Sequence, residues 1–221
     1  MIVTVTFGYE NLALQKPAWQ QFPYWNKPWG ADKAVDGLYS DRSADGGQCT
    51  ISKDDQQTAT WRVDLGEVHS IRLIKIYYRT DNVEWDSSND YTARFLGMSV
   101  YVSNTTEKNE GVLCFKDSKY TRTTIPNTIT IECIKHGRYV IYYNERLPWV
   151  TYPAGYSQYA FNELCELEIF GCSTSGVFGK HCNVPCPQNC QEGHCDIVNG
   201  TCLGCVAGYK GERCKKKYVF E

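Results

Sequence analysis

The chain of 221 residues is long enough for one sizeable domain and a small second one. Its formal net charge of −2 and pI near 6.1 give no basic footprint for nucleic acid, and no run of 18 apolar residues predicts a membrane-spanning helix. Twelve cysteines, crowded toward the C-terminus, indicate a disulfide framework made in an oxidising compartment. We therefore expect an extracellular protein, either secreted or part of a receptor ectodomain.

The first part of the chain has few apolar patterns. Met1 to Phe7 lack the basic start and the full-length apolar segment of a signal peptide. We expect a chain that has lost its leader or a fragment of a longer receptor, with residues 1–10 as an N-terminal extension. Trp19 to Trp29 form an aromatic loop whose rings we expect to pack beneath it. Ser40 to Gln48 is polar and flexible in character.

Three strands are predicted at the centre of the chain. Apolar and polar residues alternate from Thr60 to Leu65, the pattern of a strand buried on one face, and a turn at Gly66 should follow. Ile71 to Tyr78 is rich in β-branched and aromatic residues, which favours a core strand. A third strand is expected from Leu96 to Val102.

Two arginines stand at the ends of the loop between the second and third of these strands. Arg79 directly follows the core strand, with Asp81 two residues later, and Arg94 precedes the third strand. Binding residues are usually placed on loops at the end of a rigid β scaffold. Both arginines are therefore candidate binding residues.

The remaining pattern predicts an all-β fold. Strands are expected at Thr128–Cys133, Arg138–Asn144 and Leu164–Phe170, and no amphipathic helical stretch of a dozen residues appears. Short, regularly spaced strands without helices predict an antiparallel sandwich or jelly roll. Asn104 and Asn199 each begin an N-glycosylation sequon, which predicts surface positions in a glycoprotein.

Composition changes after Gly171. From Cys172 to Cys214, eight of 43 residues are cysteine, and so short a segment needs cross-links to fold. A Gly-x-x-Gly-x-x-Cys repeat occurs twice there and ends at Cys182 and at Cys214. Residues 215–221 are interpreted as a solvated basic tail.

The cysteine spacing of residues 172–214 resembles an EGF-like module of multiple-EGF-like receptors. The resemblance implies the pairs Cys186–Cys195, Cys190–Cys202 and Cys205–Cys214. Cys172 and Cys182 would then close a leading half-module, as the repeat suggests.

Residues 11–171 are similar to F-type lectin (fucolectin) domains, which are relatives of the discoidin domains. Five stretches carry the resemblance, in this order: Asn11–Ala18, Ala34–Gly37, Trp61–Gly66, Arg79–Asp81 and Leu164–Glu168. The resemblance implies a galactose-binding, discoidin-like jelly-roll β-sandwich with a bound calcium, which we expect to be structural. It also implies fucose binding through one histidine and two arginines.

Carried over residue by residue, the implied sugar site is degenerate. Ile51 occupies the position of the family histidine, and Arg79 and Asp81 match the first arginine and the aspartate after it. Arg94 can act as the second arginine across an insertion, and Trp85 is a candidate to stack on an apolar sugar face. We therefore expect weak or altered, calcium-dependent binding of fucose-like glycans.

The implied calcium site retains two carboxylates. Calcium prefers oxygen ligands, several of which can be backbone carbonyls. By family position the candidates are Lys33, Asp36, Leu38, Gln48, Cys165 and Glu166. The alternative is that Asp36 caps a turn and Glu166 is a solvated strand residue.

Two further disulfides are expected, Cys49–Cys165 and Cys114–Cys133. The sequence contains no Gly-x-Ser-x-Gly, no His-Glu-x-x-His and no phosphate-binding glycine loop, so we predict no enzyme. The expected partners are cell-surface or microbial glycans. The alternative is a receptor or adhesion ectodomain fragment that binds protein ligands without lectin activity.

Overall fold

The computed structural model describes residues 8–218 of the chain. The expectations for Met1–Phe7, and for the last three residues of the basic tail, lie outside the described residues. The sheet strands are β1 (Glu10–Asn11), β2 (Ala18–Gln20), β3 (Thr58–Tyr78), β4 (Ser99–Ser103), β5 (Val112–Lys116), β6 (Thr128–Glu145) and β7 (Leu164–Cys172). The helical segments are η1 (Ala31–Ala34), α1 (Tyr91–Phe95), η2 (Lys108–Glu110) and η3 (Gln191–Gly193).

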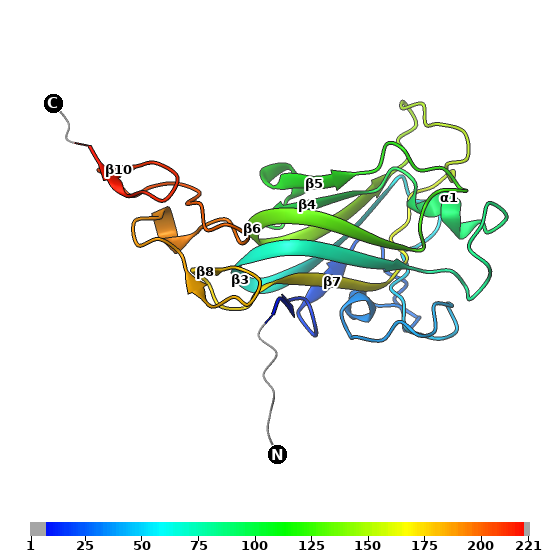
Figure 1. The fold of residues 1–221 in the computed structure, drawn as a ribbon. Coiled ribbons are helices and arrows are strands. Elements are labelled where there is room, and N and C mark those ends of the chain that lie inside the picture. The colour runs from blue at the N-terminus through cyan, green and yellow to red at the C-terminus, as the bar shows by residue number, and fades with distance from the viewer. Residues whose placement is uncertain (1–7, 219–221) are drawn as a thin grey trace, which may run out of the picture.

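One antiparallel sheet of seven strands surrounds the core. Its strands lie in the order β1-β7-β3-β6-β4-β5, and β2 pairs with the first half of β3. In that half Ala59, Trp61, Val63 and Leu65 are fully buried, which confirms the predicted alternation. The sheet curves around this core (Figure 1), and the predicted all-β sandwich fold is confirmed.

Two long strands replace four shorter predicted ones, and the predicted turn at Gly66 is wrong. β3 continues through Gly66, whose φ is +94°, and its pairing with β6 shifts register between Asp64 and His69. Gly66 therefore forms a bulge, because β6 is one continuous partner for both halves of β3. The strands predicted at Thr128–Cys133 and Arg138–Asn144 are joined within β6 for the same reason.

The segment between β3 and β4 contains the short helix α1, which the sequence pattern did not reveal. The strand expected from Leu96 begins at Ser99 instead. Five residues are too few to show a helical period. Within the described residues no helix has both the length and the apolar character needed to cross a membrane.

The cysteine-rich segment forms a narrow arm at one end of the sheet (Figure 1). Its strands are β8 (Val177–Phe178), β9 (Val184–Pro185), β10 (Tyr209–Lys210) and β11 (Lys216–Lys217). β8 pairs with β9 and β10 with β11, and the first strand of each hairpin lies within one copy of the Gly-x-x-Gly-x-x-Cys repeat. All four repeat glycines have positive φ, so the repeat in sequence is a repeat in backbone geometry.

The two ends of the described chain take part in strand pairing, unlike expectation. Glu10, expected in an N-terminal extension, pairs with Gly171 in the sheet. Lys216 and Lys217, expected in a solvated tail, are exposed but belong to β11. Both corrections arise because short terminal segments gain backbone hydrogen bonds from a neighbouring strand, which their composition does not reveal.

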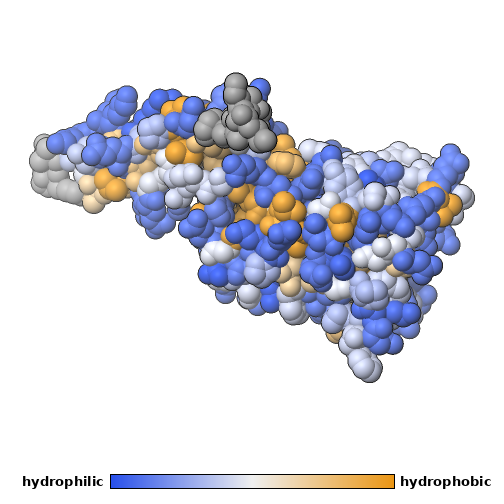
Figure 2. All heavy atoms as spheres, turned by 90° about the horizontal axis from the view of Figure 1, so that it is seen from below, coloured by the Kyte–Doolittle hydropathy of each residue, from blue (hydrophilic) through white to orange (hydrophobic). Residues whose placement is uncertain are grey.

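All twelve cysteines are paired, in the combinations expected from the sequence. The pairs are Cys49–Cys165, Cys114–Cys133, Cys172–Cys182, Cys186–Cys195, Cys190–Cys202 and Cys205–Cys214. The rings of His136 in β6 and His194 in the arm stack with 5.3 Å between their centroids. Seen from below, the largely hydrophilic surface has an apolar area where sheet and arm meet (Figure 2).

Asp64 and Arg138 form a bidentate ion pair across β3 and β6, with both nitrogen–oxygen distances at 2.7 Å. The hydrogen bonds from Arg138 hold the pKa of Asp64 at about 2, below its ordinary value of 3.8. A lowered folded-state pKa stabilises the fold above pH 4, and that contribution is lost as the pH falls toward 2.

We expect Asp64→Asn to lower the melting temperature at pH 7 and to make little difference near pH 2. Thermal denaturation of both proteins at several pH values measures this. If the difference in melting temperature between the two proteins did not shrink on acidification, it would contradict the assignment of this stability to the ion pair.

Candidate functional site

The candidate site lies where β3 ends and β7 begins. These strands are antiparallel neighbours, so the residue after β3 meets the residue before β7. The backbone nitrogen of Arg79 accordingly donates to the carbonyl of Glu163 at 3.1 Å. α1 covers this edge and contributes Tyr91 and Arg94, which share one helical face because they are three residues apart.

A buried carboxylate joins the two predicted arginines. Glu163 Oε1 accepts hydrogen bonds at 2.7 Å from Nη1 of Arg79 and from Nη1 of Arg94. Glu163 is 1% exposed, and its Oε2 has no protein partner. The two arginines predicted at the ends of one loop thus share a partner, and the sequence pattern did not reveal the carboxylate between them.

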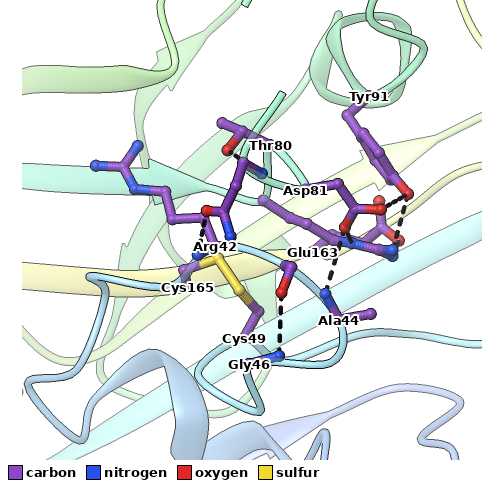
Figure 3. A network of polar contacts seen from close by, with 12 residues as sticks. Arg42, Ala44, Gly46, Cys49, Thr80, Asp81, Tyr91, Glu163 and Cys165 are labelled. Carbon is purple, nitrogen blue, oxygen red and sulfur yellow. Dashed lines mark hydrogen bonds and ion pairs between the residues drawn. A yellow bond between two sulfur atoms is a disulfide. The ribbon is translucent and has the colours of Figure 1, made fainter. Parts of the chain in front are cut away.

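Asp81 and Tyr91 complete this cluster around Arg79 (Figure 3). Arg79 Nε donates to Asp81 Oδ1 at 2.7 Å, and Arg79 Nη2 donates to the Tyr91 hydroxyl at 2.8 Å. The same hydroxyl donates to Asp81 Oδ2 at 2.6 Å, and burial with this bond raises the Tyr91 pKa to about 12. Arg79 is only 9% exposed, so its donors are largely committed to the protein.

The loop of residues 41–46 is held against this cluster rather than being flexible. The backbone nitrogens of Arg42 and Ala44 donate to Asn82 Oδ1 and Asp81 Oδ1, at 3.0 and 3.3 Å (Figure 3). The Cys49–Cys165 disulfide fixes the end of the same loop to β7. Asp81 therefore links the backbone of this loop, at Ala44, to the side chains of Arg79 and Tyr91.

Arg94 is the more available of the two arginines. Its guanidinium lies between the rings of Tyr91 and Phe161, 4.7 and 4.3 Å from their centroids. Its side chain is 25% exposed. Among the described residues its guanidinium makes one hydrogen bond, to Glu163. These cation–π contacts and the bond to Glu163 hold the guanidinium in place, and its partial exposure leaves donors for a ligand.

Arg94 lines a pocket of about 330 Å³. The other lining residues are Asp90, Ala93, Arg122, Gly155, Tyr156, Ser157, Gln158, Tyr159 and Phe161. Its volume lies at the small end of the range for ligand sites, and aromatic side chains form part of its wall.

Arg146 holds the wall of this pocket in place, a role that sequence reasoning missed. It is 6% exposed and donates to the carbonyls of Ala93, Leu96 and Ser157, at 3.3, 3.0 and 2.9 Å. The ring of Tyr156 packs on its guanidinium at 4.8 Å. No local sequence pattern marks the arginine after β6 as a structural residue, because its partners lie in α1, just after α1, and in a distant loop.

Two predicted sugar contacts are corrected. Ile51 is 3% exposed and packs with Cys49 and Cys165, so it forms no open pocket wall. Trp85 packs against the core beside Phe95, and its indole nitrogen donates to the Ile125 carbonyl at 2.7 Å. Both are apolar side chains in polar segments, and the tertiary structure provides core for them to cover.

The implied calcium ligands divide into carboxylates and carbonyl candidates. Glu166 is fully buried, its Oε2 accepts from the Gly37 nitrogen at 3.1 Å, and its Oε1 has no protein partner. Burial and the nearby charges of Asp36 and Glu168 raise the Glu166 pKa to about 7. A cation beside Oε1 would supply the missing partner, but no three His, Cys, Asp or Glu side chains among the described residues are grouped to hold a metal ion, so most ligands would have to be backbone carbonyls.

The alternative interpretation of these two carboxylates is right for one and wrong for the other. Asp36 does cap a turn, since its Oδ1 accepts from the Leu38 nitrogen at 3.0 Å. Glu166 is not solvated. Lys33 Nζ lies 3.4 Å from Asp36 Oδ2, and the Gln48 amide oxygen accepts from the Asp41 nitrogen. Cys165 has its sulfur in a disulfide, so only backbone carbonyls remain available at most of the six positions.

Comparison with known proteins agrees with this fold. Residues 33–141 match the family model described as a NedA-like, galactose-binding domain. A comparison with curated protein sequences gives no match. The fold resembles that of solved lectin structures whose sequences are each between 20 and 25% identical to this chain. Similarity at this level of identity shows a shared fold and nothing more.

Three of these structures illustrate the resemblance. The fucolectin from striped bass (Morone saxatilis) serum is 24% identical with a TM-score of 0.57; 75% of this chain aligns with half of that one. The lectin domain of lectinolysin, solved with Lewis b antigen, is 22% identical with a TM-score of 0.54, and covers 74% of this chain and 98% of its own. A Streptococcus pneumoniae fucose-binding module is 22% identical with a TM-score of 0.52, covering 74% and 96%.

Replacing Arg146 tests whether it holds the pocket wall. Arg146→Met removes the donors to the carbonyls of Leu96 and Ser157, whereas the Ala93 carbonyl still accepts from the Ser157 nitrogen. Unsatisfied buried groups cost about 1–3 kcal/mol each. We expect a loss of unfolding free energy of at least this size, measured by denaturant titration. Arg72→Met, which removes a surface ion pair with Glu132, is the control and should cost roughly 0–1 kcal/mol. Equal losses in the two variants would contradict the role assigned to Arg146.

Proposed function

We propose that this chain is an extracellular recognition protein that binds carbohydrate in the 330 Å³ pocket beside Arg94. One observation carries the proposal: the Arg94 guanidinium contacts the rings of Tyr91 and Phe161 and lines a pocket that also contains Tyr156 and Tyr159. A planar guanidinium can donate to adjacent hydroxyls, and aromatic faces pack against the apolar face of a sugar ring. Arg79 and Asp81 act behind it as positioning residues.

The rest of the chain has supporting roles in this proposal. The arm acts as an EGF-like spacer, and Asn104 and Asn199, both exposed, are glycosylation sites. Calcium, bound by the carboxylates of Asp36 and Glu166 and by backbone carbonyls, neutralises a buried charge and ties the turn after η1 to β7. The module is a binding domain rather than an enzyme.

A second candidate function is recognition of a protein ligand. Trp25 and Trp149 are 86% and 76% exposed, and exposed tryptophans are more typical of interfaces than of inert surface. They lie on loops outside the pocket, so protein binding does not depend on Arg94. The two functions are therefore separable by substitution.

Arg94 is the first test of the carbohydrate proposal. We expect binding of roughly millimolar affinity per site, a regime of about −4 kcal/mol, that becomes measurable on a dense glycan array through multivalency. Arg94→Ala should remove it, and Arg94→Lys should weaken it, because an ammonium lacks the planar fork. Thermal denaturation checks that both variants fold, and Arg72→Ala is the matched control. A blank array for the folded wild-type protein at high density would favour protein recognition instead.

Calcium is tested by stability. A ligand that binds only the folded state stabilises it, by about 2.7 kcal/mol at one hundred times its dissociation constant. We expect EDTA to lower the melting temperature and Asp36→Asn to abolish that response. Asp32→Asn, which alters a neighbouring exposed carboxylate outside the implied set, should keep the response. A melting temperature that does not change on chelation would contradict a calcium site.

A further inference from the structure

The pocket contains a second arginine that the sequence analysis did not connect with the site. Arg122 comes from the segment before β6, and its side chain is 30% exposed. Its Nη2 donates to Asp90 Oδ1 at 3.0 Å and to the Asn89 carbonyl at 3.3 Å, and its Nε donates to Thr92 Oγ1 at 3.3 Å. These bonds hold Arg122 against the start of α1, on the same pocket as Arg94.

The side chains that line this pocket carry more positive than negative charge. Among its lining residues Arg94 and Arg122 are cationic and Asp90 is anionic. The carboxylate of Asp90 is 88% exposed, so solvent screens much of its charge. Glu163, which pairs with Arg94, is 1% exposed and lies behind the guanidinium, where it balances Arg79 as well. A ligand in the pocket therefore meets two guanidinium groups and one screened carboxylate.

The wall beside Arg122 is held in place by contacts within the protein. A Cβ built on Gly155 would lie 3.5 Å from Cγ of Arg122, so that backbone packs along the aliphatic stem. The nitrogen of Ser157 donates to the Ala93 carbonyl at 3.2 Å, and Arg146 binds the carbonyl of Ser157 from behind. Binding loses less entropy when the groups that contact the ligand are already ordered.

We propose that the pocket takes an acidic sugar, whose carboxylate or sulfate group is bound by Arg94 and Arg122 while the sugar ring packs on the aromatic wall. This inference rests on the proposed carbohydrate function and names its ligand class. Guanidinium forks match carboxylate and sulfate oxygens, and these charge-assisted bonds are about twice as strong as neutral ones. Neutral glycans satisfy only the aromatic wall and bring no anionic group to the exposed edges of the two guanidinium groups, whose partners are Glu163 and Asp90.

The test compares matched neutral and acidic sugars on the full chain. Binding of methyl galactoside and methyl fucoside is measured by titration calorimetry or ligand-observed NMR against galactose 3-sulfate and the methyl glycoside of N-acetylneuraminic acid. We expect about tenfold tighter binding of at least one acidic sugar. The sulfate and carboxylate probes distinguish the two sources of charge. The preference should fall as NaCl rises from 50 to 500 mM, because salt screens exposed charges.

Three variants locate the effect. Arg122→Gln should abolish the preference for acidic sugars, whereas Arg122→Lys should retain part of it. Asp90→Asn removes the competing carboxylate and should tighten the binding of acidic sugars. Arg213→Gln, which removes an exposed arginine in the arm, should leave the preference unchanged. Melting temperatures report folding, and Arg122→Lys with Asp90→Asn carries the test if Arg122→Gln does not fold.

The outcomes are distinct. Arg94-dependent binding of neutral and acidic sugars with equal affinity overturns the acidic preference and leaves the proposed carbohydrate function intact. An acidic preference that survives Arg122→Gln and is unchanged in Asp90→Asn overturns the assigned pocket. Failure of the folded wild-type chain to bind any of the four sugars overturns both proposals.

Discussion

This end of the molecule depends on the hydrogen bonds that the buried Glu163 carboxylate accepts from two arginines. Glu163 is buried at the start of β7 and accepts hydrogen bonds from Arg79 and Arg94, which come from two different elements. A buried charge is tolerated only when it is paired, and removing one partner of such a pair is strongly destabilising. Glu163 therefore fixes the end of β3, the start of β7 and the helix α1 relative to one another.

This arrangement divides the two arginines between different tasks. Arg79 is enclosed by Glu163, Asp81 and Tyr91, and so it organises the surrounding loops. Arg94 is anchored by one hydrogen bond and two stacked rings, and so its edge stays open to the pocket.

The loops around the pocket are ordered by polar contacts rather than by regular structure. Arg146 ties the segment around Ser157 to α1, and the bonds of Asp81 and Asn82 tie residues 42–44 to the end of β3. Loops held in this way can present side chains with fixed geometry, because their backbone groups are satisfied inside the protein. The arm is also ordered by specific cross-links, but these are covalent. Four disulfides stabilise it because it is too short to form a hydrophobic core.

The sequence by itself determined the sheet and the cross-links. Alternation from Thr60 to Leu65 places Trp61 and Val63 in the core, because side chains of a strand point to opposite faces, and this period can be read from the chain. The resemblance of the cysteine spacing to EGF-like modules led to three of the six pairs, the internal repeat suggested Cys172–Cys182, and Cys49–Cys165 and Cys114–Cys133 were expected separately. The loop ends at Arg79 and Arg94 were also visible, because each arginine borders an apolar run.

Only the tertiary structure decided what these arginines contact and which side chains stay open. Glu163 lies 84 residues after Arg79, and Arg122 meets Asp90 across 32 residues, so no local pattern links them. Ile51 and Trp85 were expected at the sugar and lie instead against the core, because burial depends on which distant surface a loop covers. Local periodicity determines elements, whereas a binding site is set by contacts between residues far apart in the chain, and these exist only once the sheet has brought its loops together.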